Sequence, residues 1–181
     1  MKTTHNILSA ISFAAVAHKN QMRLDKKTPY VAHPFSVAMI LYSYGYSEHV
    51  VIAGLLHDVV EDTTYTIDDI SDAFGERVAM IVAAVTEDKG VSSRAGRKKL
   101  YLDNLANADN DTKAVCAADM LHNRLQVLDE IASGFKIWEH RDIGVDLYLQ
   151  ESYDKLRVIQ ETLNDELVLE LESVLGQIRK S

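Results

Sequence analysis

The stretch VVIAGLLHDVVED, residues 50–62, is apolar on nearly every side when it is wound as a helix. A helix that is apolar all round is a buried helix, because no face of it is suited to water. We therefore expect residues 50–62 to form a central helix that the rest of the chain surrounds. Ser47 lies just before this stretch, at a position where a serine side chain caps a helix N-terminus.

Four polar residues interrupt the apolar stretch: His57, Asp58, Glu61 and Asp62. The first and third are four residues apart, as are the second and fourth, so on a helix they form two adjacent strips of one face. Carboxylates are rarely buried without a partner, and near a helix C-terminus each costs roughly 0.3–1 kcal/mol. A bound divalent cation or a catalytic need for carboxylates explains them. A solvent-facing polar patch at the helix end is the alternative.

Most of the remaining chain shows the apolar spacing of helices, and the alternating pattern of strands is scarce. Pro34 suits the first turn of a helix that begins beside His33 and runs to about Tyr44. Gly75 predicts a break between two later helices. Further helices are expected at about residues 67–74, 76–86, 94–107, 112–128, 142–163 and 165–179, after an amphipathic helix near the N-terminus. The predicted fold class is all-α.

The length of 181 residues fits a single domain, residues 1–181, because nothing resembles a linker and a chain of this size can bury a sufficient core. We expect a motif region at about 5–130 and C-terminal helices at about 142–179 that pack on it. The alternative for those helices is the interface of a homo-oligomer. Cys116 is the only cysteine and lies in an apolar run, so we expect a buried thiol and no disulfide.

The composition disfavours two classes of partner. A formal net charge of -8 argues against a general nucleic-acid binder, which would need a basic face. No stretch approaches the roughly 20 apolar residues of a membrane span, and the N-terminus does not resemble a signal peptide, so we expect a cytoplasmic protein. Two local basic clusters suit a small anionic ligand, with a solvated surface as the alternative. They are Lys19, Arg23, Lys26 and Lys27, and Arg94, Arg97, Lys98 and Lys99.

Two more polar residues lie in apolar surroundings: His33 just before Pro34, and Asp119 within the run KAVCAADMLHNRL. Together with His57 and Asp58 they supply two imidazoles and two carboxylates. Such a set leaves coordination positions open for water or substrate, and its mixed nitrogen and oxygen donors suit manganese better than structural zinc. Each residue alone would more often be a satisfied core polar group, so the prediction depends on the four together.

Four short motifs occur in a defined order: PYVAHP at 29–34, HDVVED at 57–62, VTEDK at 85–89 and ADMLHN at 118–123. In this order they resemble the hydrolase half of RelA/SpoT-type proteins and the small alarmone hydrolases, a branch of the HD phosphohydrolase superfamily. The resemblance covers about residues 5 to 130. It implies a helical HD-domain fold and a metal-dependent hydrolase that releases pyrophosphate from the 3′ side of guanosine 3′,5′-bis(diphosphate), a small-molecule nucleotide.

The resemblance also implies roles for individual residues. By this resemblance, the metal ligands are His33, His57, Asp58 and Asp119. The catalytic acidic pair is Glu61 and Asp62, and the residues that contact the substrate are Arg23, Lys26, Lys27 and Asn123. A bound manganese ion would polarise a phosphoryl oxygen and lower the pKa of the attacking water. The acidic pair would orient that water or carry its proton.

The chain departs from the family around Asp119. Where the family commonly has a Lys-Leu-Ala-Asp-Arg/Lys run, residues 117–120 are Ala-Ala-Asp-Met. The loss of basic neighbours favours an alternative, a phosphohydrolase of another nucleotide or of a phosphorylated small molecule. A second alternative is a non-catalytic nucleotide-binding module. The retention of every predicted ligand and of both acidic residues argues against it, because a degenerate site tends to lose costly buried charges.

Overall fold

The computed structural model of the protein describes residues 3–141 and 143–181. Its α-helices are α1 Thr3–Ala17, α2 Ala32–Ser43, α3 Glu48–Leu56, α4 Val59–Asp62, α5 Ile67–Phe74, α6 Glu76–Val85, α7 Arg94–Asn107, α8 Asn110–Ala132, α9 Val145–Gln160 and α10 Glu166–Ile178, and a short 3-10 helix, η1, covers Ile137–Glu139. In the described part of the chain the only β-structure is an isolated bridge between Met22 and Pro29. The all-α prediction is confirmed.

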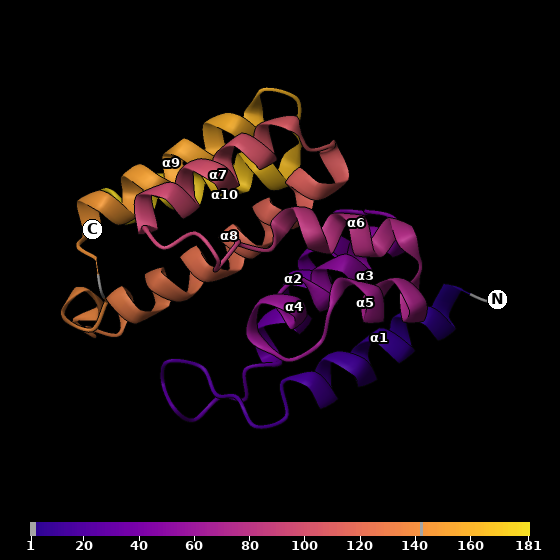
Figure 1. Ribbon diagram of the computed structural model, residues 1–181. Coiled ribbons are helices and arrows are strands. Elements are labelled where there is room, and N and C mark those ends of the chain that lie inside the picture. Colours follow the sequence, from indigo (N-terminus) through magenta and orange to yellow (C-terminus); the bar gives the residue numbers. More distant parts are fainter. Residues whose placement is uncertain (1–2, 142) are drawn as a thin grey trace.

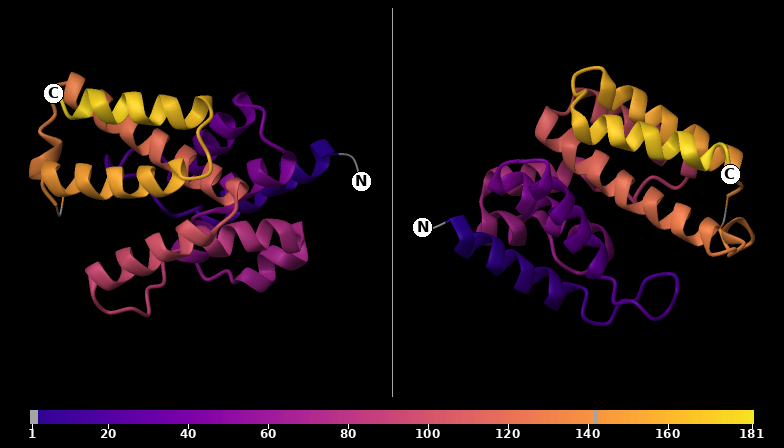
Figure 2. Two further views of the ribbon diagram at one scale, coloured as in Figure 1. Left: turned by 90° about the horizontal axis from the view of Figure 1, so that it is seen from above. Right: turned by 180° about the vertical axis from the view of Figure 1, so that it is seen from behind.

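The long helix α8 runs through the middle of the molecule (Figure 1). In Figure 1 helices α1–α6 lie on one side of it and α7, α9 and α10 on the other, and the right-hand view of Figure 2 shows the same separation for α9 and α10. α8 packs directly against α2, α3, α6, α9 and α10. Residues 112–118 of α8 are buried without interruption because neighbouring helices cover both sides.

The stretch 50–62 is central, as predicted, but it is not one continuous helix. Residues 50–56 are all buried in α3. The helix ends at Leu56 and resumes as the one-turn helix α4 at Val59. Nδ1 of His57 lies 2.9 Å from the carbonyl oxygen of Gly54, so a side chain competes with the backbone for a helical carbonyl. The break corrects the prediction of an uninterrupted helix.

Gly54 allows α2 and α3 to approach closely. A Cβ atom at this position would lie 2.5 Å from Cδ1 of Leu41 and 3.6 Å from Cα of Ala38, so a side chain here would require Leu41 to move. His33 lies at the start of α2, and α3 leads directly into His57. The close packing at Gly54 therefore helps to set the distance between the two imidazoles.

Short polar side chains fix the starts of several helices. Thr66 and Asp69 form a reciprocal capping box at α5. Other N-cap side chains accept a first-turn backbone N–H at α7, α8 and α10: Ser93, Asp109 and Asp165. Ser47 occupies the N-cap position of α3 as predicted, but its side chain makes no capping bond, because its hydroxyl lies 3.1 Å from Nε2 of His49 instead.

The C-terminal helices α9 and α10 pack against α8. The predicted start of this region at residue 142 lies outside the described residues, and α9 begins at Val145. None of the helices within residues 3–141 and 143–181 has both the length and the apolar character needed to cross a bilayer. A single domain over the whole chain stays a prediction.

Candidate active site

Three of the predicted metal ligands lie together at the junction of α2, α3 and α4. His33, His57 and Asp58 each offer one ligand atom, and these atoms lie within 4.8 Å of one another. Oδ1 of Asp119, from α8, lies 3.1 Å from Nε2 of His33 and 3.8 Å from Nε2 of His57. Both histidines are buried, with 2% and 6% of their surface exposed. Four side chains from separate parts of the sequence therefore converge.

The hydrogen bonds of the rings indicate which atoms face this centre. Nδ1 of His57 faces a carbonyl oxygen, which can only accept, so Nδ1 carries a proton and Nε2 of the neutral ring presents a lone pair. Nε2 of His33 lies 3.2 Å from Nε2 of His57, and Oδ2 of Asp58 lies 3.2 Å from the latter. Two imidazole Nε2 atoms and two carboxylates facing one point fit a divalent cation bound through nitrogen and oxygen.

The electrostatics of the centre favour a positive charge there. Burial opposes protonation of His57, but the adjacent Asp58 carboxylate outweighs burial and raises the pKa of His57 to about 9. Burial would raise the pKa of Asp58, yet the charge of His57 lowers it to about 2. Burial would also raise the pKa of Asp119, but the hydrogen bond from His33 holds the pKa of this carboxyl well below its usual range. Both carboxylates are thus ionised and ready to bind a cation.

Two residues outside the predicted set orient the ligands. The Tyr30 hydroxyl donates to Oδ2 of Asp58 at 2.6 Å. Nδ1 of His122 lies 2.8 Å from Nδ1 of His33, and burial, with the nearby His33, lowers the pKa of His122 to about 4. Each of the two lies three residues from a ligand, within the motifs PYVAHP and ADMLHN. That spacing is the signal that would have identified them.

The contact between His122 and His33 gives a first prediction. In the variant His122→Ala, His33 loses the partner that fixes its ring orientation, so affinity for a divalent cation should fall about 10–100-fold. Calorimetric titration with Mn²⁺ measures the change. His140, which lies outside the site, provides the matched control His140→Ala with unchanged affinity. Equal affinities in the two variants would show that the histidine contact does not support the metal site.

The two acidic residues predicted as a catalytic pair have different surroundings. Glu61 lines the cavity beside the metal ligands; its carboxylate accepts the backbone N–H of Glu87 at 3.0 Å, and burial raises its pKa. Asp62 is exposed and is not among the lining residues. Its carboxylate accepts the Tyr30 hydroxyl at 3.2 Å and the Lys89 ammonium group at 3.1 Å. Glu61 can therefore contact a molecule bound in the cavity, whereas the carboxylate of Asp62 is engaged by Tyr30 and Lys89.

The cavity beside the four converging side chains has a volume of about 290 Å³. Arg23 and Asn123, both predicted to contact substrate, line it and share a hydrogen bond of 3.1 Å. Lys26 and Lys27 are exposed and are not among its lining residues. They lie in a tight turn in which the Asp25 carboxylate accepts the backbone N–H of Lys27 at 2.8 Å. The structure does not bring these two lysines to the cavity, and their contact with phosphates stays a prediction.

Besides Tyr30, seven further residues line the cavity without having been predicted as site residues: Val85, Glu87, Lys98, Tyr101, Val115, Cys116 and Lys155. Lys98 forms an ion pair of 2.9 Å with Glu87. The Tyr101 hydroxyl donates to Sγ of Cys116 at 3.3 Å, and Cys116 is buried as predicted. Glu87 belongs to the motif VTEDK and Lys98 to a basic cluster, so their place in the sequence is a reason to consider both as site residues. Nothing in the sequence offers such a reason for Lys155, because the apolar residues of α9 are spaced as in a helix that packs on the core.

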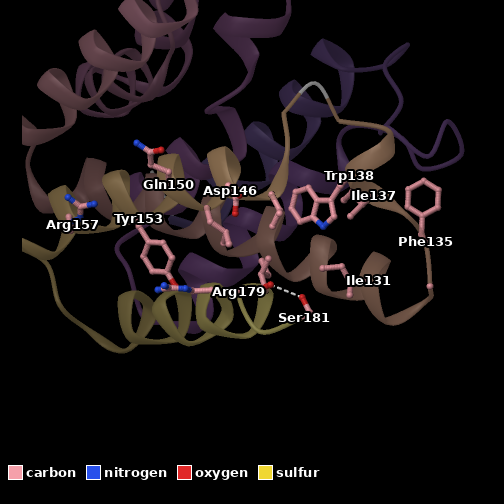
Figure 3. A pocket seen from close by; sticks show the side chains of 14 residues that line it. Ile131, Phe135, Ile137, Trp138, Asp146, Gln150, Tyr153, Arg157, Arg179 and Ser181 are labelled. Carbon is pink, nitrogen blue, oxygen red and sulfur yellow. Dashed lines mark hydrogen bonds between the residues drawn. The ribbon is translucent and has the colours of Figure 1, made fainter.

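A second, larger hollow of about 1010 Å³ lies between η1, α9 and the end of α10 (Figure 3). Its labelled side chains include Trp138, Tyr153 and Arg179. It shares no lining residue with the cavity beside His33 and His57. The clustered metal-ligating groups therefore identify the smaller cavity as the candidate active site.

Comparison with known proteins shows which family the chain resembles. The sequence model of the HD domain family matches residues 10–123. The guanosine-3′,5′-bis(diphosphate) 3′-pyrophosphohydrolase MESH1 of Xenopus tropicalis is 43% identical over 120 residues, which cover 65% of this chain and 66% of that protein. MESH1 of Danio rerio is 39% identical over 124 residues, which cover 67% of this chain and 68% of that protein. The matched segments thus span about two thirds of these relatives.

The fold is also similar to that of a solved structure described as a metazoan ortholog of SpoT that hydrolyses ppGpp. The TM-score is 0.81 at 30% sequence identity, and the superposition covers 95% of this chain and 94% of the other. The motif order, the helical fold and these similarities agree. The chain therefore belongs to the HD domain family, in the branch that contains the guanosine-bis(diphosphate) pyrophosphohydrolases.

Proposed function

We propose that this protein is a metal-dependent guanosine 3′,5′-bis(diphosphate) 3′-pyrophosphohydrolase. The observation that carries the proposal is the convergence of His33, His57, Asp58 and Asp119 beside a cavity that Glu61 also lines. The names of the relatives support the substrate. The products would be guanosine 5′-diphosphate and pyrophosphate.

The proposed reaction is hydrolysis at the 3′-diphosphate. Water forms a bond to the phosphorus next to the ribose, the bond from that phosphorus to the 3′ oxygen breaks, and the 3′ oxygen takes up a proton. A divalent cation held by the four ligands supplies polarisation of a phosphoryl oxygen and a lowered pKa of water. Glu61 accepts the proton of the attacking water, a task favoured by its raised pKa. Arg23 and Asn123 bind the nucleotide.

We propose manganese as the physiological ion, because two imidazoles and two carboxylates form a mixed nitrogen and oxygen set. The role of Asp62 is positional in this proposal, since its carboxylate holds the Tyr30 hydroxyl that contacts Asp58. A cytoplasmic location and the oligomeric state stay predictions of the sequence.

Metal affinity should depend on pH. Without metal, His57 holds a proton below pH about 9, and a cation must displace that proton to reach the imidazole. Apparent affinity for Mn²⁺ should therefore rise as the pH increases, by up to about tenfold per pH unit below about 9. Calorimetry in buffers of different ionisation enthalpy measures both the affinity and the protons released. An affinity that is constant from pH about 6.5 to about 8.5 would contradict this charge state.

The substrate is tested with purified protein and Mn²⁺ against guanosine 3′,5′-bis(diphosphate) and a panel of other nucleotides and phosphorylated small molecules. Pyrophosphate release from the first compound is the expected result. Turnover of another compound alone would favour the second candidate function, a phosphohydrolase of different specificity, which the neutral residues at 117–120 support. Absence of phosphate or pyrophosphate release from every compound would refute the enzymatic function.

A further inference from the structure

Lys155 is a cation of the cavity that forms no direct ion pair among the described residues, and the Asp119 carboxylate attracts it only from a greater distance. It extends from α9, is partly buried, and lines the cavity beside the predicted metal ligands. Its Nζ lies 4.2 Å from the ring centroid of Tyr101. Among the ion pairs of the described residues, none includes Lys155. Lys98, the other lysine of the cavity, is neutralised by Glu87 at 2.9 Å.

Such a lysine is costly for the fold. Burial lowers the pKa of Lys155, because its surroundings compensate the ammonium charge incompletely. The Tyr101 ring offsets part of the cost through a cation–π contact. A leucine or methionine would fill the same volume without desolvating a charge. Packing therefore does not explain why a lysine lies here, whereas an anionic ligand would.

The cavity wall formed by α8 shows where this anion would lie. Cys116, Asp119 and Asn123 line the cavity in that order along the helix. At 1.5 Å per residue, Cys116 is about 4.5 Å before Asp119 and Asn123 about 6 Å beyond it. Arg23 is bonded to Asn123 at one end, and Tyr101, which carries Lys155 over its ring, is bonded to Cys116 at the other. The predicted metal ligand therefore lies between two cations.

The two ends differ in their chemistry. Near Arg23 there are two side-chain amides, Asn123 and Gln126, both bonded to its guanidinium at 3.1 and 2.5 Å. Amides and a planar guanidinium are suited to the ring atoms and hydroxyls of a nucleoside. The other end offers the ammonium group of Lys155, which suits phosphate as a compact point charge.

We propose that Lys155 is a substrate-binding residue that holds the outer phosphate of the 3′-diphosphate, on the far side of the metal centre from Arg23. The inference rests on the proposed function and makes it more specific. It assigns to α9 the recognition of a diphosphate rather than a monophosphate at the 3′ position. The residues of α8 next to Asp119 are neutral, where related proteins commonly have basic residues. In this proposal Lys155 of α9 provides the positive charge instead.

The first test is binding of inorganic pyrophosphate to the manganese-loaded protein, measured by calorimetry. Lys155→Met should weaken binding about 10–100-fold, the effect of losing one hydrogen bond to a charged group. Lys155→Arg should retain most of the affinity, because it keeps a cation at the site. Lys136→Met, at an exposed lysine that pairs with Glu139 and does not line the cavity, is the matched control and should bind like the wild type.

Stability distinguishes this role from a structural one. Because Lys155 is desolvated without an ion pair, Lys155→Met should melt at or above the temperature of the wild-type protein. A lower melting temperature together with unchanged pyrophosphate affinity would assign the residue to the fold and overturn the inference.

Kinetics separate this inference from the proposed function. The wild-type protein should prefer a 3′-diphosphate to a 3′-monophosphate of guanosine 5′-diphosphate, and Lys155→Met should lose about 10–100-fold of that preference in kcat/KM. If the wild type hydrolyses the 3′-diphosphate and the variant keeps the full preference, the role of Lys155 is refuted while the function stands. If the wild type hydrolyses neither compound but binds pyrophosphate through Lys155, the function fails and the phosphate site stands.

Discussion

Asp58→Ala should abolish both the binding of a divalent cation and turnover. Oδ2 of Asp58 lies 3.2 Å from Nε2 of His57 and 3.5 Å from Nε2 of His33. Its removal leaves the two imidazoles facing Asp119 alone, and the remaining charge no longer balances a divalent ion. The pKa of His57, which Asp58 raises to about 9, should also fall. Calorimetry with Mn²⁺ and a pyrophosphate-release assay measure the two losses on the same sample.

The matched control for Asp58→Ala is Asp72→Ala. Asp72 is an exposed residue of α5 and is not among the residues that line the cavity. Its removal deletes the same number of atoms and the same charge, so it should leave metal affinity and turnover unchanged. An Asp58→Ala variant that loses the metal but retains full activity would show that this ion is not the catalyst.

Local sequence patterns predicted the helices well because their signals are local. The helix expected at 67–74 is α5, with Gly75 as the break before α6, and the helix expected at 94–107 is α7. Capping side chains and apolar spacing act within one or two turns, so one sequence is enough to read them. The break between α3 and α4 was missed because it depends on where the ring of His57 lies relative to Gly54.

The candidate site shows the same contrast between local and long-range information. The convergence of His33, His57 and Asp119 could be anticipated from the motif order, although 24 residues separate the first two and more than twice as many separate the last two. Lys155 could not be anticipated, because it reaches the cavity from a helix whose pattern indicates packing. Such a contribution depends on how α9 lies on α7 and α8, which no local pattern encodes.

The acidic pair shows how structure divides residues that sequence treats alike. Glu61 and Asp62 are adjacent, and the motif HDVVED gives no reason to separate them. Successive residues of a helix differ in direction by about 100°. One of the two therefore lines the cavity, while the other is exposed and held by Lys89. The pair should accordingly contribute unequally to catalysis.

This division gives the second large expected effect. Glu61→Gln should lower kcat about 10²–10⁴-fold, the usual contribution of a general base. Affinity for Mn²⁺ should remain unchanged, because Glu61 is not one of the four residues proposed to hold the ion. The amide oxygen of glutamine can still accept the backbone N–H of Glu87, so the local structure should be preserved. Single-turnover kinetics and metal titration measure the two quantities separately.

The control is the adjacent substitution Asp62→Asn, which should cost about tenfold or less, because Asp62 acts only through the Tyr30 hydroxyl. The pH profile adds an independent readout. Burial raises the pKa of Glu61, and a base works only when deprotonated, so kcat of the wild type should fall as the pH drops through that raised pKa. In Glu61→Gln this acidic limb should vanish, whereas Asp62→Asn should keep it. If Asp62→Asn loses the limb and Glu61→Gln retains it, the roles of the two carboxylates are reversed, and the base approaches the substrate from the Tyr30 side of the cavity.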